Sequence, residues 1–209
     1  VESLLFKAGA VARKGRIEEG TRVSDYDSQE KHRKHSIDLS CAHLDWKGVR
    51  VHLIDTPGYR DFVGQVYCGM VAVEPAVVAV DADEGVRPHT GKVWQIAENL
   101  GIPCFISINR VDREQAKLEG VLTQIQEQLH ARCLPLAVPK GSGPGFTGVE
   151  AVLGNKSPSP EGKEAASRLI EAVVESNDAL MERYLGGESI ADEEVEAQLR
   201  EAVLTRSIF

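Results

Sequence analysis

The stretch Val49-Arg50-Val51-His52-Leu53-Ile54-Asp55-Thr56-Pro57-Gly58 decides the fold class of this chain. Its residues alternate and then become continuously apolar before proline and glycine break the run, which predicts a sheet strand followed by a loop. In open α/β sheets, ligands bind at the carboxyl edge of the strands, where such a loop lies. An aspartate there can hold a metal-bound water, and a glycine lets a backbone N–H approach a phosphate. Taken alone, the same residues also suit an ordinary strand-to-helix turn with Asp55 as N-cap.

A second polar loop, Asn109-Arg110-Val111-Asp112, follows another apolar strand in the same way. Asp112 can accept hydrogen bonds from guanine N1–H and the 2-amino group, whereas adenine lacks that amino donor. Asn109 can tie neighbouring loops together, and the stem of Arg110 can cover the ring face of the base. Together the D-x-x-G and N-[K/R]-x-D loops indicate a guanine-nucleotide site. The alternative is that Asp112 and Gln115 form a capping box for the next helix.

Length, composition and charge limit the classes of protein to which this chain can belong. The 209 residues are enough for a full core, as one domain or with a smaller unit. The chain is 42% hydrophobic and 27% charged, as is ordinary for soluble globular proteins, and no apolar run approaches a membrane span. With a net charge of −8, we expect no membrane partner and no binding to free DNA. The cysteines are widely spaced, without a C-x-x-C pair, which indicates reduced, mainly packing thiols in a cytoplasmic protein.

Apolar periodicity predicts alternating strands and helices. A helix over residues 1–9 and a polar, mobile loop over 13–38 precede two antiparallel strands, 37–46 and 49–54, joined at Lys47-Gly48. The next predicted elements are helix 62–73, strand 76–80, helix 90–100, strand 103–108 and helix 113–132. This order predicts an α/β fold with a mainly parallel sheet, one antiparallel hairpin and flanking helices.

A basic cluster occupies residues 31–35 of the predicted loop. Its two histidines, His32 and His35, have no carboxylate or cysteine at metal-ligand spacing, so we predict no metal site there. A solvated loop is the favoured interpretation of this cluster.

The composition changes after Cys133. Glycine and proline break regular structure up to residue 145, and Ser157-Pro158-Ser159-Pro160 marks a second loop. Two amphipathic helices, 164–184 and 192–205, then follow, joined at Gly186-Gly187. We therefore predict a core domain over residues 1–133 and an appended, mostly helical subdomain over 134–209.

The motifs resemble those of translation elongation factor G and its relatives. Asp55-Thr56-Pro57-Gly58-Tyr59-Arg60-Asp61-Phe62 resembles the switch II segment, and Asn109-Arg110-Val111-Asp112-Arg113 resembles the guanine-reading motif. Residues 81–94 resemble the stretch that follows switch II, and residues 180–188 are similar to the subdomain inserted in elongation factor G.

The resemblance implies a P-loop GTPase fold, GTP or GDP with Mg²⁺ as ligands, and a ribosome as partner. It also implies a set of nucleotide-binding residues: Asp55, Thr56, Pro57, Gly58, Asn109, Arg110 and Asp112. Asp55 would hold the Mg²⁺ through a water molecule.

The chain departs from the family pattern at its start. The phosphate-binding G-x-x-x-x-G-K-[ST] loop is absent, and the opening helix resembles the one that would follow it. The last residues, Ser207-Ile208-Phe209, resemble the stretch just before the family's second guanine-contacting loop. We therefore expect a piece of a longer protein, cut on both sides, and no hydrolysis by residues 1–209 alone.

Two further departures concern the chemistry. The family's switch I usually carries Gly-Ile-Thr-Ile with a metal-binding threonine, whereas this chain has His35-Ser36-Ile37-Asp38, in which Ser36 keeps a hydroxyl. The family has a histidine that positions the attacking water, and this chain has Tyr59 there, directly after Gly58. Tyr59 and Gly58 are thus the candidate catalytic residues, although a phenol, with a reference pKa of about 10, is a poorer match than imidazole.

These observations predict the GTP-binding and GTP-hydrolysing domain of an elongation factor G-like translation factor. One alternative is a GTP-dependent, ribosome-associated switch with little or no hydrolysis, as Tyr59 and Ser36 suggest. The other is a non-nucleotide α/β scaffold in which the absence of the phosphate loop is genuine.

Overall fold

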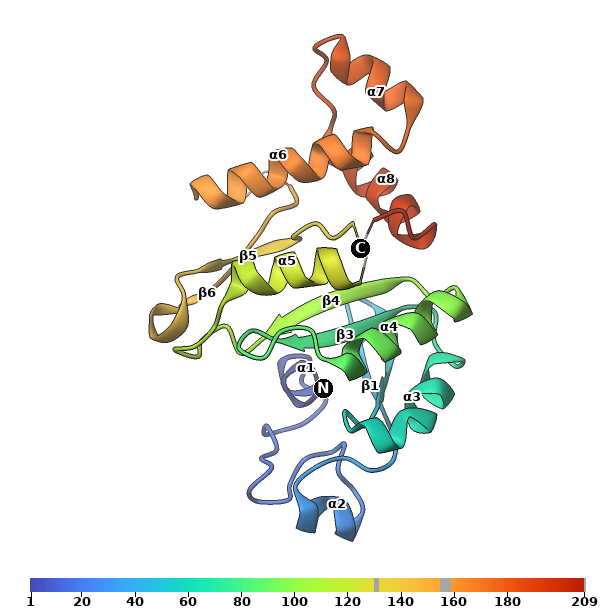
Figure 1. Ribbon diagram of the computed structural model, residues 1–209, viewed down its shortest axis with the longest axis vertical. Coiled ribbons are helices and arrows are strands. Elements are labelled where there is room, and N and C mark those ends of the chain that lie inside the picture. Colours follow the sequence, from blue (N-terminus) through green and yellow to red (C-terminus); the bar gives the residue numbers. More distant parts are fainter. Residues whose placement is uncertain (130–131, 155–158, 209) are drawn as a thin grey trace. The chain divides into compact units, whose positions relative to one another are not determined.

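A computed structural model describes residues 1–129, 132–154 and 159–208 (Figure 1). The chain divides into two compact units. Unit 1 comprises Val1–Glu74 with Glu98–Leu100, and unit 2 comprises Pro75–Ala97 with Gly101–Phe209.

The described strands pair in three two-stranded sheets. In unit 1, β1 (Ser40–Trp46) pairs antiparallel with β2 (Val49–Asp55). In unit 2, β3 (Ala76–Asp81) pairs in parallel with β4 (Cys104–Asn109), and β5 (Ala137–Lys140) pairs antiparallel with β6 (Gly148–Ala151). The α/β class and the predicted antiparallel hairpin are confirmed. Among the described strands, however, parallel pairing is limited to β3 and β4, so the predicted mainly parallel sheet is seen only as this one pair.

The turn between β1 and β2 follows from its two residues. Lys47 and Gly48 both have positive φ, 50° and 80°, as a two-residue turn that matches the twist of a hairpin requires. The resulting register places Ser40 opposite Asp55. The chain that enters β1 therefore begins beside the loop that leaves β2.

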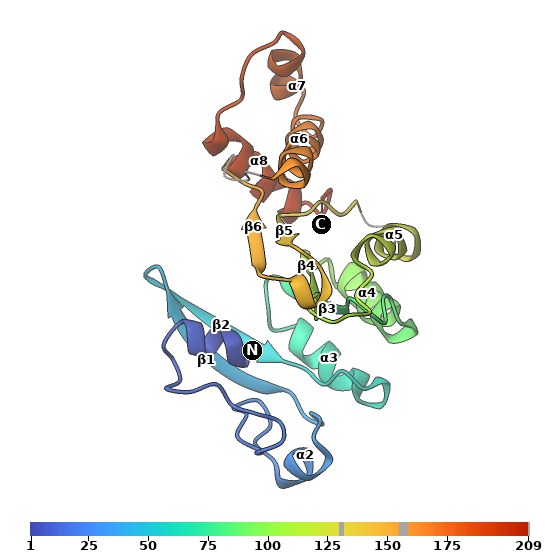
Figure 2. The same ribbon diagram turned by 90° about the vertical axis from the view of Figure 1, so that its left-hand side faces the viewer.

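Eight α-helices lie within the described residues. They are α1 (Glu2–Lys7), α2 (Ser28–Arg33), α3 (Val63–Met70), α4 (Pro88–Leu100), α5 (Leu118–Gln128), α6 (Pro160–Val174), α7 (Asp178–Leu185) and α8 (Asp192–Leu204). In unit 1, α1 packs on β1. In unit 2, α6 packs on α8, and the two helices lie next to each other in both views (Figures 1 and 2).

The predicted mobile loop over residues 13–38 is wrong for its second half, where α2 forms. This short helix begins with a capping box in which the Asp27 side chain accepts from the Gln29 N–H at 2.7 Å and the Glu30 carboxylate accepts from the Asp27 N–H at 3.0 Å. Asp27 and Glu30 satisfy backbone donors that a helix start otherwise leaves unpaired. The prediction failed because α2 buries Glu30 and no apolar residue, so apolar periodicity gives no signal.

Three predicted helices have different bounds in the structure. The helix expected from residue 113 begins only at Leu118, because N–H groups of Arg113 and Ala116 close two turns first, and residues 130–131 of that prediction lie outside the described range. The helix expected over 164–184 is two helices, because the Asn177 side chain accepts from the Ala179 and Leu180 N–H groups and starts α7. Helix α4 begins two residues earlier than predicted, at Pro88, and proline is favoured in a first turn.

The stretch after Cys133 is not only irregular, as predicted. Strands β5 and β6 form there, and their four residues each are too few to show alternation in the sequence. Of the predicted loop at 157–160, Ser157 and Pro158 lie outside the described residues, and Ser159 is the N-cap of α6.

The part of unit 2 after Cys133 has a hydrophobic core of its own. Side chains of β5, α6, α8, the residues after β6 and the C-terminal turn form it, including Val152, Leu169, Val173, Leu199 and Ile208. The predicted boundary at residue 133 stays a prediction, and this core supports it.

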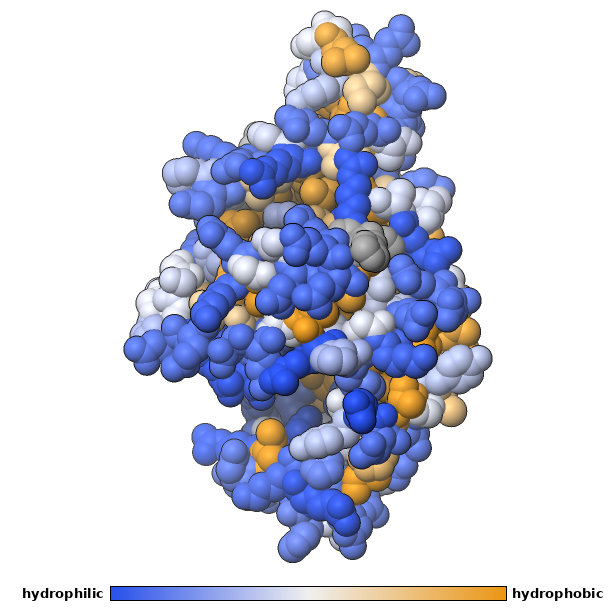
Figure 3. Space-filling view, viewed as in Figure 1, coloured by the Kyte–Doolittle hydropathy of each residue, from blue (hydrophilic) through white to orange (hydrophobic). Residues whose placement is uncertain are grey.

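On the face seen in Figure 3, hydrophilic residues predominate and apolar residues form small separate groups. Among the described helices, not one combines the length and the apolar character that crossing a membrane demands.

Helix α3 approaches the end of β2 at Gly69. A Cβ added at this glycine would lie 2.8 Å from the Thr56 methyl carbon and 3.3 Å from a methyl carbon of Ile54. Because real Cβ atoms do not come so close, only glycine permits this approach. The packing of α3 thus fixes the start of the Asp55-Thr56-Pro57-Gly58 loop.

We predict that Gly69→Ala lowers the free energy of unfolding. Alanine favours a helix over glycine by about 1 kcal/mol, but overpacking typically costs about 1–3 kcal/mol, so the clash with Thr56 prevails. Urea denaturation measures the difference. Gly64→Ala in the same helix is the control, because an added Cβ there meets no atom within 4 Å, and its stability should be unchanged or raised. Equal stability of the two variants would contradict the close approach.

Candidate functional site

Asp55, at the end of β2, is joined to Ser36 by a chain of polar contacts within unit 1. Arg22 lies between two carboxylates, with Nη2 4.0 Å from Asp55 Oδ2 and Nη1 3.0 Å from Asp25 Oδ2. The Ser36 hydroxyl donates to Asp25 Oδ1 at 2.8 Å, and Asp25 is buried. The structure therefore connects two predicted site residues through Arg22 and Asp25, which the sequence analysis missed.

The segment that carries Arg22, Asp25 and Ser36 is held by two buried glutamates. Glu2 accepts hydrogen bonds from the N–H groups of Gly15 at 3.0 Å and Val23 at 2.5 Å. Glu30, which is fully buried, accepts from three backbone N–H groups: Asp27 at 3.0 Å, Ile37 at 2.9 Å and Asp38 at 3.2 Å. The hydrogen bonds to these two carboxylates hold the segment in place, because the segment has no apolar core of its own.

The three donors determine the protonation of Glu30. Burial by itself raises the pKa of the carboxyl, but the N–H groups of Ile37, Asp27 and Asp38 stabilise its charged form and outweigh burial. The pKa of Glu30 therefore lies below its ordinary value of 4.5, and the carboxylate is charged at neutral pH.

The loop after β2 is partly open to solvent. Pro57 is buried, Gly58 is exposed, and the Tyr59 side chain is 56% exposed. No heavy atom lies within 4 Å of the position that a Cβ of Gly58 would take, so a ligand can approach the backbone there. The Tyr59 ring lies 4.5 Å from the His35 ring, centroid to centroid, at an interplanar angle of 41°.

In unit 2, the predicted guanine-reading residues follow β4. Asn109 accepts from the Ser107 hydroxyl at 3.1 Å, and Arg110 pairs with Asp81 at 2.6 Å. Asp112 is exposed, and its carboxylate has no hydrogen-bond or ion-pair partner within the described part of the chain, so its oxygens are available to a donor pair. Because α5 begins only at Leu118, with Lys117 as N-cap, the alternative that Asp112 and Gln115 cap this helix is wrong.

Asp81, at the end of β3, is itself strongly held. Partial burial acts to raise its pKa, but hydrogen bonds from the Asp83 N–H and the Arg110 guanidinium outweigh it and keep the pKa below the ordinary value. Asp81 is therefore a stable anionic partner that orients Arg110 at neutral pH.

Two backbone contacts support the 109–112 loop from either side. The Asn109 carbonyl accepts from the Ala82 N–H at 2.9 Å, and the Val111 carbonyl accepts from the Gly143 N–H at 3.1 Å. Gly143 has φ of 53°, in the left-handed region that favours glycine. Its contact joins the part of unit 2 after Cys133 to the candidate base-reading loop, which the sequence did not reveal.

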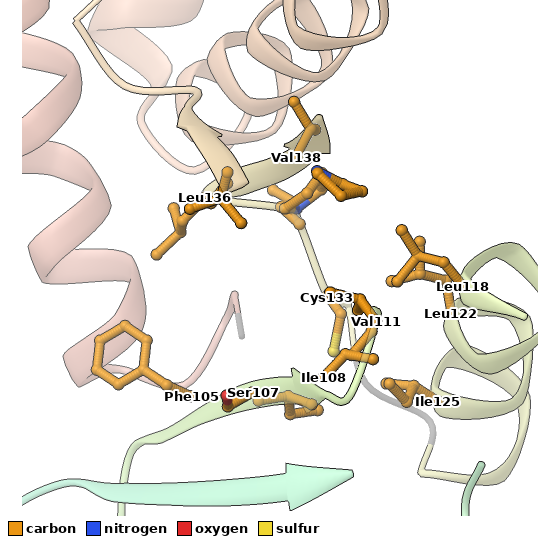
Figure 4. Close-up of a pocket in the computed structure, with 16 residues that line it drawn as sticks. Phe105, Ser107, Ile108, Val111, Leu118, Leu122, Ile125, Cys133, Leu136 and Val138 are labelled. Atoms are coloured by element: carbon orange, nitrogen blue, oxygen red, sulfur yellow. The ribbon is translucent and has the colours of Figure 1, made fainter. Parts of the chain in front are cut away.

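An apolar cavity of about 380 Å³ lies between β4, α5 and β5 (Figure 4). Figure 4 shows Ile108, Leu122, Ile125 and Cys133 around it, with Ser107 among the few polar side chains. Burial raises the pKa of the Cys133 thiol to about 11, so it stays protonated. This lining suits apolar side chains and offers no donors for a phosphate.

The predicted site residues thus form two groups. Asp55, Ser36 and Tyr59 gather in unit 1, and Asn109, Arg110 and Asp112 in unit 2. A single site that contains both groups is a proposal.

The unit 1 group fits a Mg²⁺ ion that also binds phosphates. Mg²⁺ takes oxygen ligands and usually binds one or two protein oxygens, with water and phosphate completing its shell. The Ser36 hydroxyl donates its hydrogen to Asp25, so the lone pairs of the Ser36 oxygen remain available to a cation. Asp55 offers a carboxylate. The described residues contain no cluster of three or more histidine, cysteine or acidic side chains that would hold a metal without such help.

Comparison with known proteins identifies the class. The model of the family "Elongation factor Tu GTP binding domain" matches residues 1–204, and the chain belongs to this family.

Particular relatives are also similar. The chain is 35% identical to the "Elongation factor G-like protein" of two strains of Mycobacterium tuberculosis, CDC 1551 / Oshkosh and H37Rv, over an alignment of 224 positions. A crystal structure of a protein from Thermus thermophilus matches 99% of the chain with a TM-score of 0.91 and 31% identity. The chain spans only about a third of these relatives, 31% of the former and 34% of the latter.

We predict that Glu30→Gln loosens the segment that carries Ser36. The amide would turn an NH₂ donor toward backbone donors, and leaving a buried donor unsatisfied costs about 1–3 kcal/mol. Hydrogen exchange should show faster exchange of the Ile37 and Asp38 amides in the variant.

The same carboxyl also predicts a pH dependence. Because the pKa of Glu30 is lowered in the folded state, its contribution to stability is present above the ordinary value of 4.5 and is lost as the pH falls below it. Urea unfolding between about pH 7 and pH 3 should show a smaller loss of stability for Glu30→Gln than for wild type. Parallel pH profiles would contradict this role of Glu30.

Proposed function

We propose that the full-length gene product binds GTP with Mg²⁺ through this domain and hydrolyses it as an elongation factor G-like translation factor. One observation carries the proposal: in a chain of this family, Asp112 lies in the loop after β4 as an exposed carboxylate without a partner in the described residues. A guanine base supplies the two adjacent N–H donors that such a carboxylate accepts.

In the proposed reaction, water attacks the γ-phosphorus in line with the bond to the departing GDP oxygen. Mg²⁺, when bound, neutralises charge on the β- and γ-phosphates. Ser36 would hold the ion directly and Asp55 would hold it through water. Gly58 would direct its N–H to the γ-phosphate, and the Tyr59 hydroxyl would orient the attacking water. Thr56 and Pro57 would set the path of this loop.

A ribosome is the proposed partner, and the cytoplasm the proposed location. The support is the 35% identity to proteins described as elongation factor G-like. Because the chain spans 31% of those proteins, ribosome binding is proposed for the full-length gene product.

A second candidate function is a GTP-dependent switch on the ribosome that hydrolyses little. Tyr59 favours it, because an uncharged phenol offers only hydrogen bonds at neutral pH. Calorimetric titration of the full-length gene product with GTP and GDP, followed by phosphate release with and without ribosomes, separates the candidates. Binding with stimulated release supports the GTPase, and binding without release supports the switch. If neither GTP nor GDP binds, the result supports the alternative of a scaffold that binds no nucleotide.

We predict that Asp112→Asn changes the choice of base. The substitution replaces one acceptor oxygen with an NH₂ donor that faces the guanine 2-amino group. Affinity for GTP should fall by about 1–3 kcal/mol, and affinity for XTP should rise because the 2-oxo group of xanthine accepts. Competitive titrations of the full-length gene product with the two nucleotides measure this change. An unaltered preference for GTP would show that Asp112 does not read the base.

We predict that substitutions at Tyr59 change turnover and leave GTP affinity unchanged. Tyr59→Phe keeps the ring but loses the water-orienting hydroxyl, and losing one such group typically costs about 10²-fold or more in rate. Tyr59→His should raise turnover above wild type. Phosphate release in the presence of ribosomes is the measurement. Fast wild-type turnover that Tyr59→Phe leaves intact would place the water-orienting group elsewhere.

A further inference from the structure

His35 stands against the candidate catalytic loop, although the sequence assigned it to a solvated basic cluster. Its ring lies 4.5 Å from that of Tyr59, and both residues belong to unit 1. The pair is not core packing, because Tyr59 is 56% exposed and His35 is only half-buried. Core packing therefore does not explain the contact between the His35 and Tyr59 rings, and we look for a functional explanation.

A hydrogen bond determines which nitrogen of His35 carries the hydrogen. Nδ1 lies 3.1 Å from the Arg33 carbonyl oxygen, and a carbonyl oxygen only accepts. Nδ1 is therefore the donor, and in the neutral imidazole Nε2 keeps its lone pair. No described residue hydrogen-bonds to Nε2, so this nitrogen can accept a hydrogen bond from water.

The backbone holds His35 firmly in this position. Lys34 ends α2 with φ of 60°, which turns the chain sharply before His35. After His35, the Ser36 hydroxyl donates to Asp25, and the Ile37 N–H donates to buried Glu30. The imidazole is thus attached to a pre-organised segment, as an orienting group must be.

We propose that His35 is a water-orienting residue of the GTPase reaction, acting from the segment before β1 together with Tyr59. The inference rests on the proposed GTP hydrolysis. Nε2 accepts a hydrogen bond from the water whose oxygen forms the new bond to the γ-phosphorus. The bond between this phosphorus and the oxygen bridging to GDP breaks in the same step. Both water hydrogens leave with the dihydrogen phosphate that is released.

The test compares His35→Phe, His35→Gln and His32→Phe in the full-length gene product with ribosomes. Phenylalanine keeps a ring against Tyr59 without nitrogens, and glutamine restores an acceptor near the Nε2 position. His32 is the matched control, because it is an exposed histidine of the same basic cluster.

We expect kcat to fall about tenfold to hundredfold in His35→Phe, with KM for GTP changed by no more than about twofold. His35→Gln should recover most of the loss, and His32→Phe should behave as wild type. Unchanged kcat in His35→Phe, or an equal loss in His35→Gln, would overturn the inference while leaving the proposed GTPase function in place. A wild type that binds GTP without turnover would overturn both.

A second readout needs no nucleotide. The ring current of Tyr59 should displace the NMR signals of the His35 ring protons, and Tyr59→Leu should remove this displacement whereas Tyr59→Phe should keep it. Signals that do not respond to Tyr59→Leu would show that the rings are not in contact in solution, which would overturn the inference.

Discussion

The Glu30 carboxylate is excluded from solvent, so its charge must be balanced inside the protein. Transfer of an unpaired carboxylate into an apolar interior is prohibitively costly, but backbone donors can make the site favourable. Glu30 meets this condition through the N–H groups of Asp27, Ile37 and Asp38. The same three bonds close the chain around α2 and set the path of residues 34–38. Without them, neither Ser36 nor His35 would have a defined position beside the loop after β2.

In unit 1, the strength of each ion pair depends on the distance between its two charges and on their exposure to solvent. Arg22 is 3.0 Å from buried Asp25 but 4.0 Å from Asp55, so most of its charge is balanced by Asp25. The Asp55 side chain, 28% exposed, thus keeps much of its negative charge for a cation. The exposed pair of Arg50 and Asp45 in the same sheet is different, because solvent screening leaves such pairs worth little. The contact between Arg22 and buried Asp25 is screened less and can help to position this group of residues.

The sequence predicted what depends on local pattern. Alternation and turn residues correctly predicted strand β2 with Asp55, the Lys47-Gly48 turn and the strand before Asn109, because these features are visible in the local sequence. Helix α2 was missed although Asp27 and Glu30 have capping-box spacing, since a six-residue helix that buries only a glutamate shows no apolar face. Contacts between distant residues, such as Gly143 with Val111, leave no periodic signal at all. The positions of Arg22, Asp25 and His35 belong to this second kind.

The β1–β2 hairpin explains why His35 and Tyr59 can work as a pair. The two residues come from segments on either side of the hairpin, and the register that places Ser40 opposite Asp55 brings these segments together at one end. The rings belong to different segments, so a shift of either one relative to the hairpin separates them. Orienting groups lose their effect when displaced by about 1 Å. The proposed water-orienting pair therefore requires both segments to keep their positions, and the contacts of Ser36 with Asp25 and of Ile37 with Glu30 hold the segment that carries His35.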